Sequence, residues 1–292
     1  MNDDEAQDAA RGRVLVEVAE LAALLAEGGR VTLVDVRGSV TGPPGRPEYE
    51  AGHLPGAVFV DLETELSAAP GEGGRHPLPD PEAFEAAMRA AGVDDDVEVV
   101  AYDARTSLYA ARLWWLLTDA GHRRVRVLDG GYAAWVEAGL EVETGPGPSP
   151  DAGGFTARPG QRPRVTADEI VAGRAPTLVD VRAGERYRGE TEPLDPVAGH
   201  IPGALNRPAA TLLDASGHFR TGEELRAALD GLDEPAFYCG SGVTAAQALL
   251  ALEATGGRGS IYPGSWSEWI RDPGRPVATG EEPTDGTGAE QQ

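Results

Sequence analysis

Short apolar runs that do not alternate with polar residues mark the strands predicted for this chain. Three of them, Val31–Val36, Val97–Tyr102 and Val125–Leu128, lie in the first half, and Pro235–Tyr238 lies in the second. A strand that helices cover on both faces is apolar throughout, whereas a half-exposed strand alternates. The runs therefore favour parallel sheets buried between helices.

Helix signals lie between these runs. Asp80 followed by Pro81 pairs an N-cap with a proline in the first turn, and Thr221 with Glu224 predicts a capping box. Good helix formers fill residues 243–253. The alternation of strand and helix predicts an α/β protein with mostly parallel sheets flanked by helices.

Three sequence blocks occur twice, in the same order. The blocks of the first half are Val31–Arg37, Ala51–Ala57 and Asp129–Trp135, and their counterparts are Thr177–Arg182, Ala198–Ala204 and Pro263–Trp269. Ordered matches of this kind indicate a duplicated domain. We predict one domain over residues 13–142, a linker rich in glycine and proline over 143–163, a second domain over 164–279 and a disordered tail over 280–292.

Charge and composition exclude several classes of partner and site. The formal net charge is −23 at pH 7 and every one of the 25 basic residues is an arginine, so we expect no nucleic acid and no anionic membrane as partner. No apolar run reaches the ~20 residues of a membrane helix, and the acidic N-terminal segment does not resemble a secretory signal, so we expect a cytoplasmic protein. One cysteine and five scattered histidines predict neither a disulfide nor a metal site, and we expect no cofactor.

The single cysteine, Cys239, stands between a predicted strand and a predicted helix. The small residues Gly240, Ser241 and Gly242 follow it, and the helix begins at Val243 and Thr244. Such a loop can turn several backbone N–H groups toward the sulfur, and the helix N-terminus adds partial positive charge. Both effects favour an anionic sulfur, the thiolate, over the neutral thiol. We predict a nucleophilic sulfur in an anion cradle; the plain alternative is a buried cysteine that only packs.

The equivalent loop of the first half carries Asp103 where the cysteine would stand. An aspartate cannot carry sulfur, so we expect the first domain to be catalytically silent.

These motifs resemble the tandem-domain rhodanese family, the thiosulfate and 3-mercaptopyruvate sulfurtransferases. The resemblance covers about Val14 to Thr279 and rests on His53–Ala57 with its repeat at His200, on Cys239–Ala245 and on Tyr262–Trp269. It implies two tandem rhodanese-like domains and a Cys239 persulfide that is formed from a sulfur donor. A small thiol, cyanide or a thioredoxin-like protein then accepts the sulfur.

The resemblance leaves the donor open between 3-mercaptopyruvate and thiosulfate. Gly240 and Ser241 match the mercaptopyruvate enzymes, whereas the thiosulfate enzymes carry two basic residues there. Arg186 matches an arginine of both branches and would bind the anionic group of the donor. The second arginine of the mercaptopyruvate enzymes has no match near Asp195, which is closer to the thiosulfate branch.

Five further residues are candidates for support of the site. Asp180 and Arg182 are expected to form a structural ion pair at a strand end, and His53 and His200 to anchor their loops by hydrogen bonds. Trp266 is expected to pack beside the cysteine loop.

Two other functions compete with sulfur transfer by turnover. A cysteine phosphatase needs an arginine six residues after its cysteine, and this chain has Ala245 there. A persulfide carrier that hands sulfur to a protein partner without turnover shares the same loop chemistry, so this alternative stays open.

Overall fold

The computed structural model describes residues 3–38 and 45–281, and these residues form two compact units. Of the described residues, unit 1 comprises 3–38, 45–68, 78–162 and 213–220, and unit 2 comprises 69–77, 163–212 and 221–281. Within the described residues, no helix is both long and apolar enough to cross a membrane. The predicted tail falls almost wholly outside the described residues.

Unit 1 is built on a parallel five-stranded sheet in the order β1-β5-β4-β2-β3. Its strands are β1 (Leu15–Val16), β2 (Val31–Asp35), β3 (Val58–Phe59), β4 (Glu98–Tyr102) and β5 (Val125–Leu128). Its helices are α1 (Asp3–Val14), α2 (Val18–Ala26), α3 (Arg46–Ala51), α4 (Pro81–Ala90), α5 (Leu108–Asp119) and α6 (Gly131–Glu137). The predicted strands of the first half are thus confirmed to within one residue at each end.

Unit 2 repeats this arrangement with a parallel four-stranded sheet in the order β7-β6-β8-β9. Its strands are β6 (Leu178–Asp180), β7 (Leu205–Asn206), β8 (Ala236–Tyr238) and β9 (Ser260–Ile261). Its helices are α7 (Ala167–Val171), α8 (Gly184–Tyr187), the 3₁₀ turn η1 (Ala209–Leu212), α9 (Gly222–Ala228), α10 (Val243–Ala254) and α11 (Ser265–Trp269). The sheet order β3-β2-β4-β5 of unit 1 recurs as β7-β6-β8-β9, which is the topology that a duplication requires.

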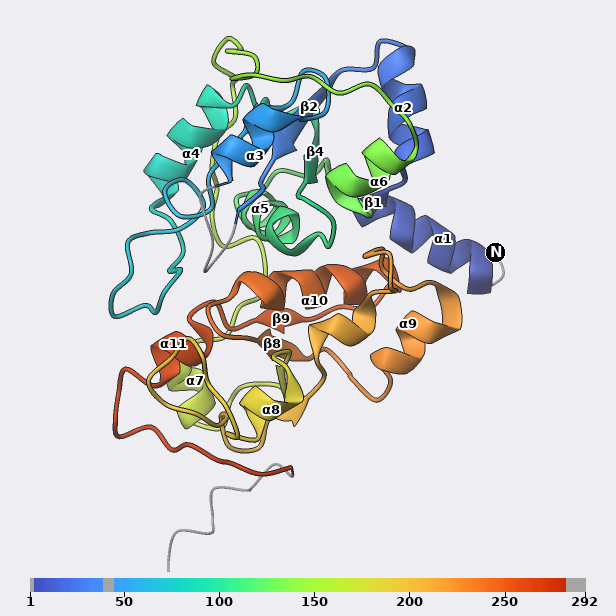
Figure 1. Cartoon of the computed structure of the whole chain (residues 1–292). Coiled ribbons are helices and arrows are strands. Elements are labelled where there is room, and N and C mark those ends of the chain that lie inside the picture. The colour runs from blue at the N-terminus through green and yellow to red at the C-terminus, as the bar shows by residue number, and fades with distance from the viewer. Residues whose placement is uncertain (1–2, 39–44, 282–292) are drawn as a thin grey trace, which may run out of the picture. The chain divides into compact units, whose positions relative to one another are not determined.

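One helix of each unit lies directly after the loop that carries the candidate residue. Helix α5 contacts β4 and β5, and α10 contacts β8 and β9, as Figure 1 shows for α10. Both helices are buried along most of their length, with Trp114 and Trp115 of α5 no more than 1% exposed. This burial fixes the helix N-terminus, and with it the loop that feeds into the helix.

The helix caps follow the sequence prediction in one case and differ in the other. The Asp80 carboxylate accepts hydrogen bonds from the N–H groups of Glu82 and Ala83 at the start of α4. Thr221 precedes α9, but its side chain makes no cap hydrogen bond, so the predicted capping box is not present. A capping box is found instead at α7, between Thr166 and Glu169. Thr221 stands before a glycine with a positive φ of 50°, which turns the backbone away from the geometry that the box needs.

Each compact unit is made of segments that are not continuous in the chain. The segment expected as a linker belongs to unit 1 up to Arg162, because Phe155 is fully buried and hydrogen-bonds Val93 through its N–H. Residues 213–220 also belong to unit 1, where the Phe219 N–H donates to Asp129. Residues 69–77 belong to unit 2. A sequence repeat identifies the elements that the two domains share. The segments that pack outside these elements are determined by tertiary contacts.

Candidate active site

Cys239 lies at the carboxyl end of β8, in the loop that runs into α10. Its side chain is 2% exposed, and the Gly242 N–H donates to its Sγ atom over 3.1 Å. Gly242 has a φ of 81°, and a Cβ there would collide with the Pro263 backbone. Only glycine satisfies both conditions, so this residue lets the backbone curl around the sulfur.

The first turn of α11 supports the cysteine loop through hydrogen bonds. The Cys239 N–H donates to Ser265 Oγ over 3.1 Å, and the Cys239 carbonyl accepts from the Trp266 N–H over 3.0 Å. The Ser267 N–H donates to the Gly240 carbonyl over 2.9 Å. Ser265 is a non-glycine residue with a positive φ of 54°, a strained conformation that these contacts maintain. The repeated block near Trp266 therefore serves to support the loop.

Asp103 occupies the equivalent position in unit 1, and the loop there binds its carboxylate. Its carboxylate accepts four backbone hydrogen bonds, from the N–H groups of Arg105, Ser107, Tyr109 and Ala110, over 2.8 to 3.3 Å. Burial raises the pKa of the Asp103 carboxyl, and the four N–H donors oppose that rise. The loop and the start of the following helix thus form a cradle for negative charge, as the sequence predicts for Cys239.

The other predicted cradle residues lie where the sequence places them. Gly240 and Ser241 continue the loop, and Val243 and Thr244 form the first turn of α10. Gly242 is the residue before this helix and is the donor to the sulfur. The N-terminus of a helix of 12 residues is therefore directed at the loop.

Arg186 lies on α8 and is already held by a carboxylate. Its Nε and Nη2 atoms donate to the two oxygens of Glu192 over 3.1 and 2.6 Å. Burial tends to raise the pKa of Glu192, but the hydrogen bonds from Arg186 and Leu194 and the charges of Arg186 and Arg182 outweigh it and lower that pKa. Arg182 contacts Glu192 over 3.2 Å and pairs with Asp180 at the end of β6, as expected. Glu192 was not singled out in the sequence.

A segment distant in sequence brings two further side chains to the cysteine loop. Residues 69–77 belong to unit 2, and within them His76 Nδ1 lies 2.7 Å from Ser241 Oγ. The adjacent Arg75 forms an ion pair with Asp195. Neither residue was predicted for the site. The only local signal is a polar Arg–His pair between Gly74 and Pro77, since the segment has no periodic pattern and no counterpart among the repeated blocks.

The two histidines that the sequence proposed for support occupy matching structural positions. His53 Nδ1 lies 2.9 Å from the Tyr49 carbonyl in unit 1, and His200 Nδ1 lies 2.7 Å from the Tyr187 carbonyl in unit 2. Each ring stacks on that tyrosine. Burial lowers the pKa of His200, which favours the neutral form of the ring. These contacts are those of loop anchors, and the histidine in contact with Ser241 is His76.

Trp266 lies on α11, next to the cysteine loop, and is fully buried. Its indole N–H donates to the Val197 carbonyl over 2.8 Å, and the Arg182 guanidinium lies over its ring at 4.7 Å from the centroid. The tryptophan therefore links the cysteine loop, through its own backbone N–H, to the Arg182 ion pair. Among the described residues, no group of three or more metal-ligating side chains is present.

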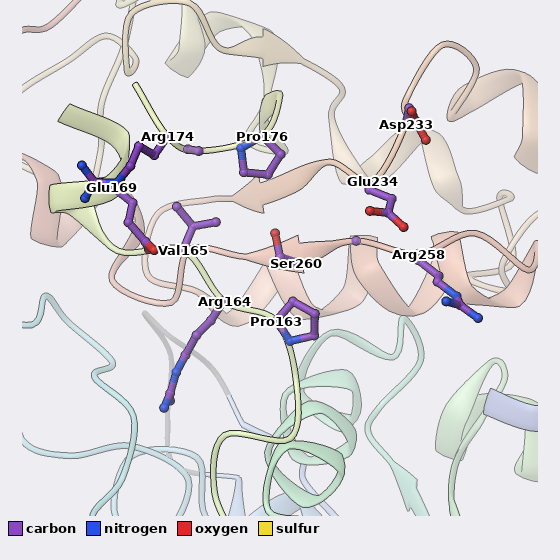
Figure 2. Close-up of a pocket in the computed structure, with 12 residues that line it drawn as sticks. Pro163, Arg164, Val165, Glu169, Arg174, Pro176, Asp233, Glu234, Arg258 and Ser260 are labelled. Carbon is purple, nitrogen blue, oxygen red and sulfur yellow. The ribbon is translucent and has the colours of Figure 1, made fainter. Parts of the chain in front are cut away.

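A pocket of about 640 Å³ lies at the other end of the unit 2 sheet (Figure 2). Its lining includes Pro176, Glu234 and Ser260, which stand at or just before the amino ends of β6, β8 and β9. Open parallel sheets bind substrates at the carboxyl ends of their strands, where Cys239 lies. This pocket is therefore separate from the candidate active site.

Comparison with known proteins assigns the fold. The family model for the rhodanese-like domain matches residues 17–138 and 165–272. The chain is 47% identical over 282 residues to the putative thiosulfate sulfurtransferase SseB of Mycobacterium tuberculosis, covering 93% of this chain and 99% of that protein. It is 43% identical over 281 residues to the probable 3-mercaptopyruvate sulfurtransferase of Pseudomonas aeruginosa, covering 91% and 98%.

A solved structure agrees with these sequence matches. The crystal structure of SseA from Escherichia coli, a 3-mercaptopyruvate sulfurtransferase, superposes with a TM-score of 0.77 at 34% identity, covering 87% of this chain and 99% of that one. The resemblance inferred from the motifs is thereby confirmed. With two matched domains, a cysteine loop at the carboxyl end of the second sheet and an aspartate in its place in the first, this chain belongs to the rhodanese family of sulfurtransferases.

Proposed function

We propose that this protein moves a sulfane sulfur from 3-mercaptopyruvate or thiosulfate to a thiol or cyanide acceptor through a persulfide on Cys239. The observation that carries the proposal is the loop of residues 239–244, in which a lone cysteine receives the Gly242 N–H ahead of a helix N-terminus. The matching loop of unit 1 supports it, because its four N–H donors hold a carboxylate.

With thiosulfate, both half-reactions are nucleophilic displacements at sulfur. The Cys239 thiolate attacks the outer sulfur, the S–S bond of thiosulfate breaks, and sulfite leaves with the bonding electrons. Cyanide or a thiolate then attacks the outer sulfur of the persulfide, and the Cys239 thiolate is regenerated as thiocyanate or a new persulfide leaves. The cradle stabilises negative charge on the sulfur in each resting state of this cycle.

With 3-mercaptopyruvate, the first half-reaction also moves protons. The donor thiol loses a proton, the C–S bond breaks as Cys239 takes the sulfur, and the enolate of pyruvate must gain a proton at carbon. Ser241 follows Cys239 by two residues in the same loop, and its hydroxyl oxygen lies 2.7 Å from His76 Nδ1. A hydroxyl paired with an imidazole can accept and return a proton. Because thiosulfate needs no such transfer, the Ser241–His76 pair favours mercaptopyruvate as donor.

The acceptor must come from outside the chain. Cys239 is the only cysteine, so no internal thiol can take the outer sulfur, nor form a disulfide with Cys239 and release sulfide. Its 2% exposure favours a small acceptor, cyanide or a small thiol, over a thioredoxin-like protein, which needs a more open thiol.

The test is the turnover of the purified protein with each donor, measured as kcat/KM with cyanide as acceptor. Cys239→Ser is expected to abolish turnover with both donors and to prevent the gain of one sulfur atom by intact-mass spectrometry. Turnover by Cys239→Ser at the wild-type rate would rule the proposal out. A persulfide that forms on Cys239 but is not released to cyanide or small thiols would favour the carrier.

A further inference from the structure

Arg75 reaches the cysteine loop on a short, tightly held turn. Gly71 and Gly74 exchange backbone hydrogen bonds over 3.0 Å, and the Arg75 N–H donates to Ser267 Oγ over 3.0 Å. A Cβ on Gly74 would lie 3.0 Å from the Gly264 carbonyl oxygen, so the turn packs directly against the start of α11. Because α11 also supports the cysteine loop, the backbone of Arg75 has a fixed position relative to Cys239.

The Arg75 guanidinium lies beside the residue that follows the cysteine. A Cβ built on Gly240 would be 2.7 Å from Arg75 Nη2 and 3.6 Å from Arg186 Nη2. Two guanidinium groups therefore flank Gly240, and any larger residue there would displace Arg75. Side-chain exposures of 22% for Arg75 and 17% for Arg186 leave both groups accessible to a small anion.

A buried carboxylate holds these two cations together. Asp195, with a side chain that is 4% exposed, forms an ion pair with Arg75 through Oδ1 and lies 3.6 Å from Arg186 Nη2 through Oδ2. Arg186 uses its Nε and Nη2 donors to bind Glu192, whereas Arg75 binds Asp195 through Nη1. Of the two arginines, Arg75 thus keeps more hydrogen-bonding capacity for a further anion.

We propose that Arg75 and Arg186 together bind the anionic group of the sulfur donor, and that Asp195 competes with the donor for the same guanidinium groups. This inference rests on the proposed function and adds Arg75 to the residues that determine the affinity for the donor. No arginine stands at residues 193–196, and Arg75 supplies the second positive charge from a distant segment of the chain. Gly240 has no side chain, which leaves space for the Arg75 guanidinium.

The expected effect is on donor affinity more than on chemistry. Arg75→Met removes the charge and keeps a side chain of similar length. We expect it to raise KM for both donors by about 10- to 100-fold, the effect of losing one charge-assisted hydrogen bond, with a smaller change in kcat. The larger effect is expected for thiosulfate, which carries two negative charges. Asp195→Asn is expected to lower both KM values, because it removes the competing carboxylate.

A matched control separates this role from loss of net positive charge. Arg188→Met removes an arginine of unit 2 whose partner is the exposed Glu190, and it is expected to leave both KM values unchanged. Arg75→Lys keeps the positive charge but not the two-pronged guanidinium, so we expect a KM between those of wild type and Arg75→Met. It replaces Arg75→Met in the test if that variant fails to fold. A donor KM in the Arg75 variants equal to that of Arg188→Met would overturn the inference.

A binding measurement distinguishes this inference from the proposed function. Thiosulfate is titrated calorimetrically into Cys239→Ser, which cannot turn over, and into the same variant with Arg75→Met. A loss of affinity of about 10-fold or more supports the inference even if wild-type protein transfers no sulfur. Equal affinity of the two proteins contradicts it, whatever the turnover of the wild type.

Discussion

At the scale of single residues, the two domains differ in the residue that follows the equivalent strand. Cys239 and Asp103 stand at the end of equivalent strands and before equivalent helices. Both receive backbone N–H groups from their loop, one donor in the case of the sulfur and four in the case of the carboxylate. The unit 1 loop thus has the same kind of anion cradle, with a carboxylate at the position of the candidate nucleophile.

The Asp103 carboxylate is expected to stabilise unit 1 because it satisfies buried N–H groups. Asp103→Ala would leave donors of Ser107 and Ala110 without a partner in a site from which water is excluded. We expect the free energy of unfolding to fall by about 2–4 kcal/mol. Urea denaturation measures it, with Asp80→Ala, which removes an exposed cap of α4, as the comparison at about 1 kcal/mol. An equal loss in both variants would contradict this account.

At the scale of elements, the caps of α7 and α9 offer a direct test of local geometry. Thr166 and Glu169 form a complete capping box at α7, whereas Thr221 makes no side-chain cap hydrogen bond at α9. We expect Thr166→Ala to lower the free energy of unfolding by about 1 kcal/mol, and Thr221→Ala by less than about 0.5 kcal/mol. Chemical denaturation of the two variants measures the difference, and a larger loss for Thr221→Ala would contradict it.

The pH dependence of the α7 cap follows from Glu169. Hydrogen bonds from the backbone N–H and the hydroxyl of Thr166 lower the pKa of Glu169. A carboxyl with a lowered folded pKa contributes stability above its unfolded pKa of about 4.3 and loses it as the pH falls through the folded pKa. The difference between wild type and Thr166→Ala is therefore expected to be full at pH 7 and to shrink below pH 4, which denaturation at both pH values measures.

At the scale of the whole molecule, the charge is strongly unbalanced. A net charge of −23 on 292 residues implies mutual repulsion among surface carboxylates. Salt screens the surface repulsion over a Debye length of about 10 Å at 0.1 M. We expect the Tm to rise by a few degrees between about 0.02 and 0.3 M NaCl. Calorimetry measures this, and the rise should vanish near the isoelectric point; a Tm that falls with salt at pH 7 would contradict it.

The sequence by itself determined the scaffold and the position of the candidate nucleophile. Strand runs such as Val31–Val36, the ordered repeat and the position of Cys239 before a glycine-rich turn depend on residues close together in the chain. Burial between helices imposes a continuous apolar pattern, and a left-handed turn at Gly242 needs glycine, so both leave a local trace. The ion pair of Asp180 and Arg182, two residues apart, could be predicted for the same reason.

Only the tertiary structure decided what surrounds the sulfur. Arg75 and His76 reach the loop from a segment without periodic pattern, and the ion pairs of Glu192 with Arg186 and of Asp195 with Arg75 are not indicated by the local sequence. The limits of the two units were likewise set by contacts such as that of Phe219 with Asp129. These arrangements rest on single contacts between segments far apart in the chain, and a contact of that kind imposes no repeated pattern on either segment.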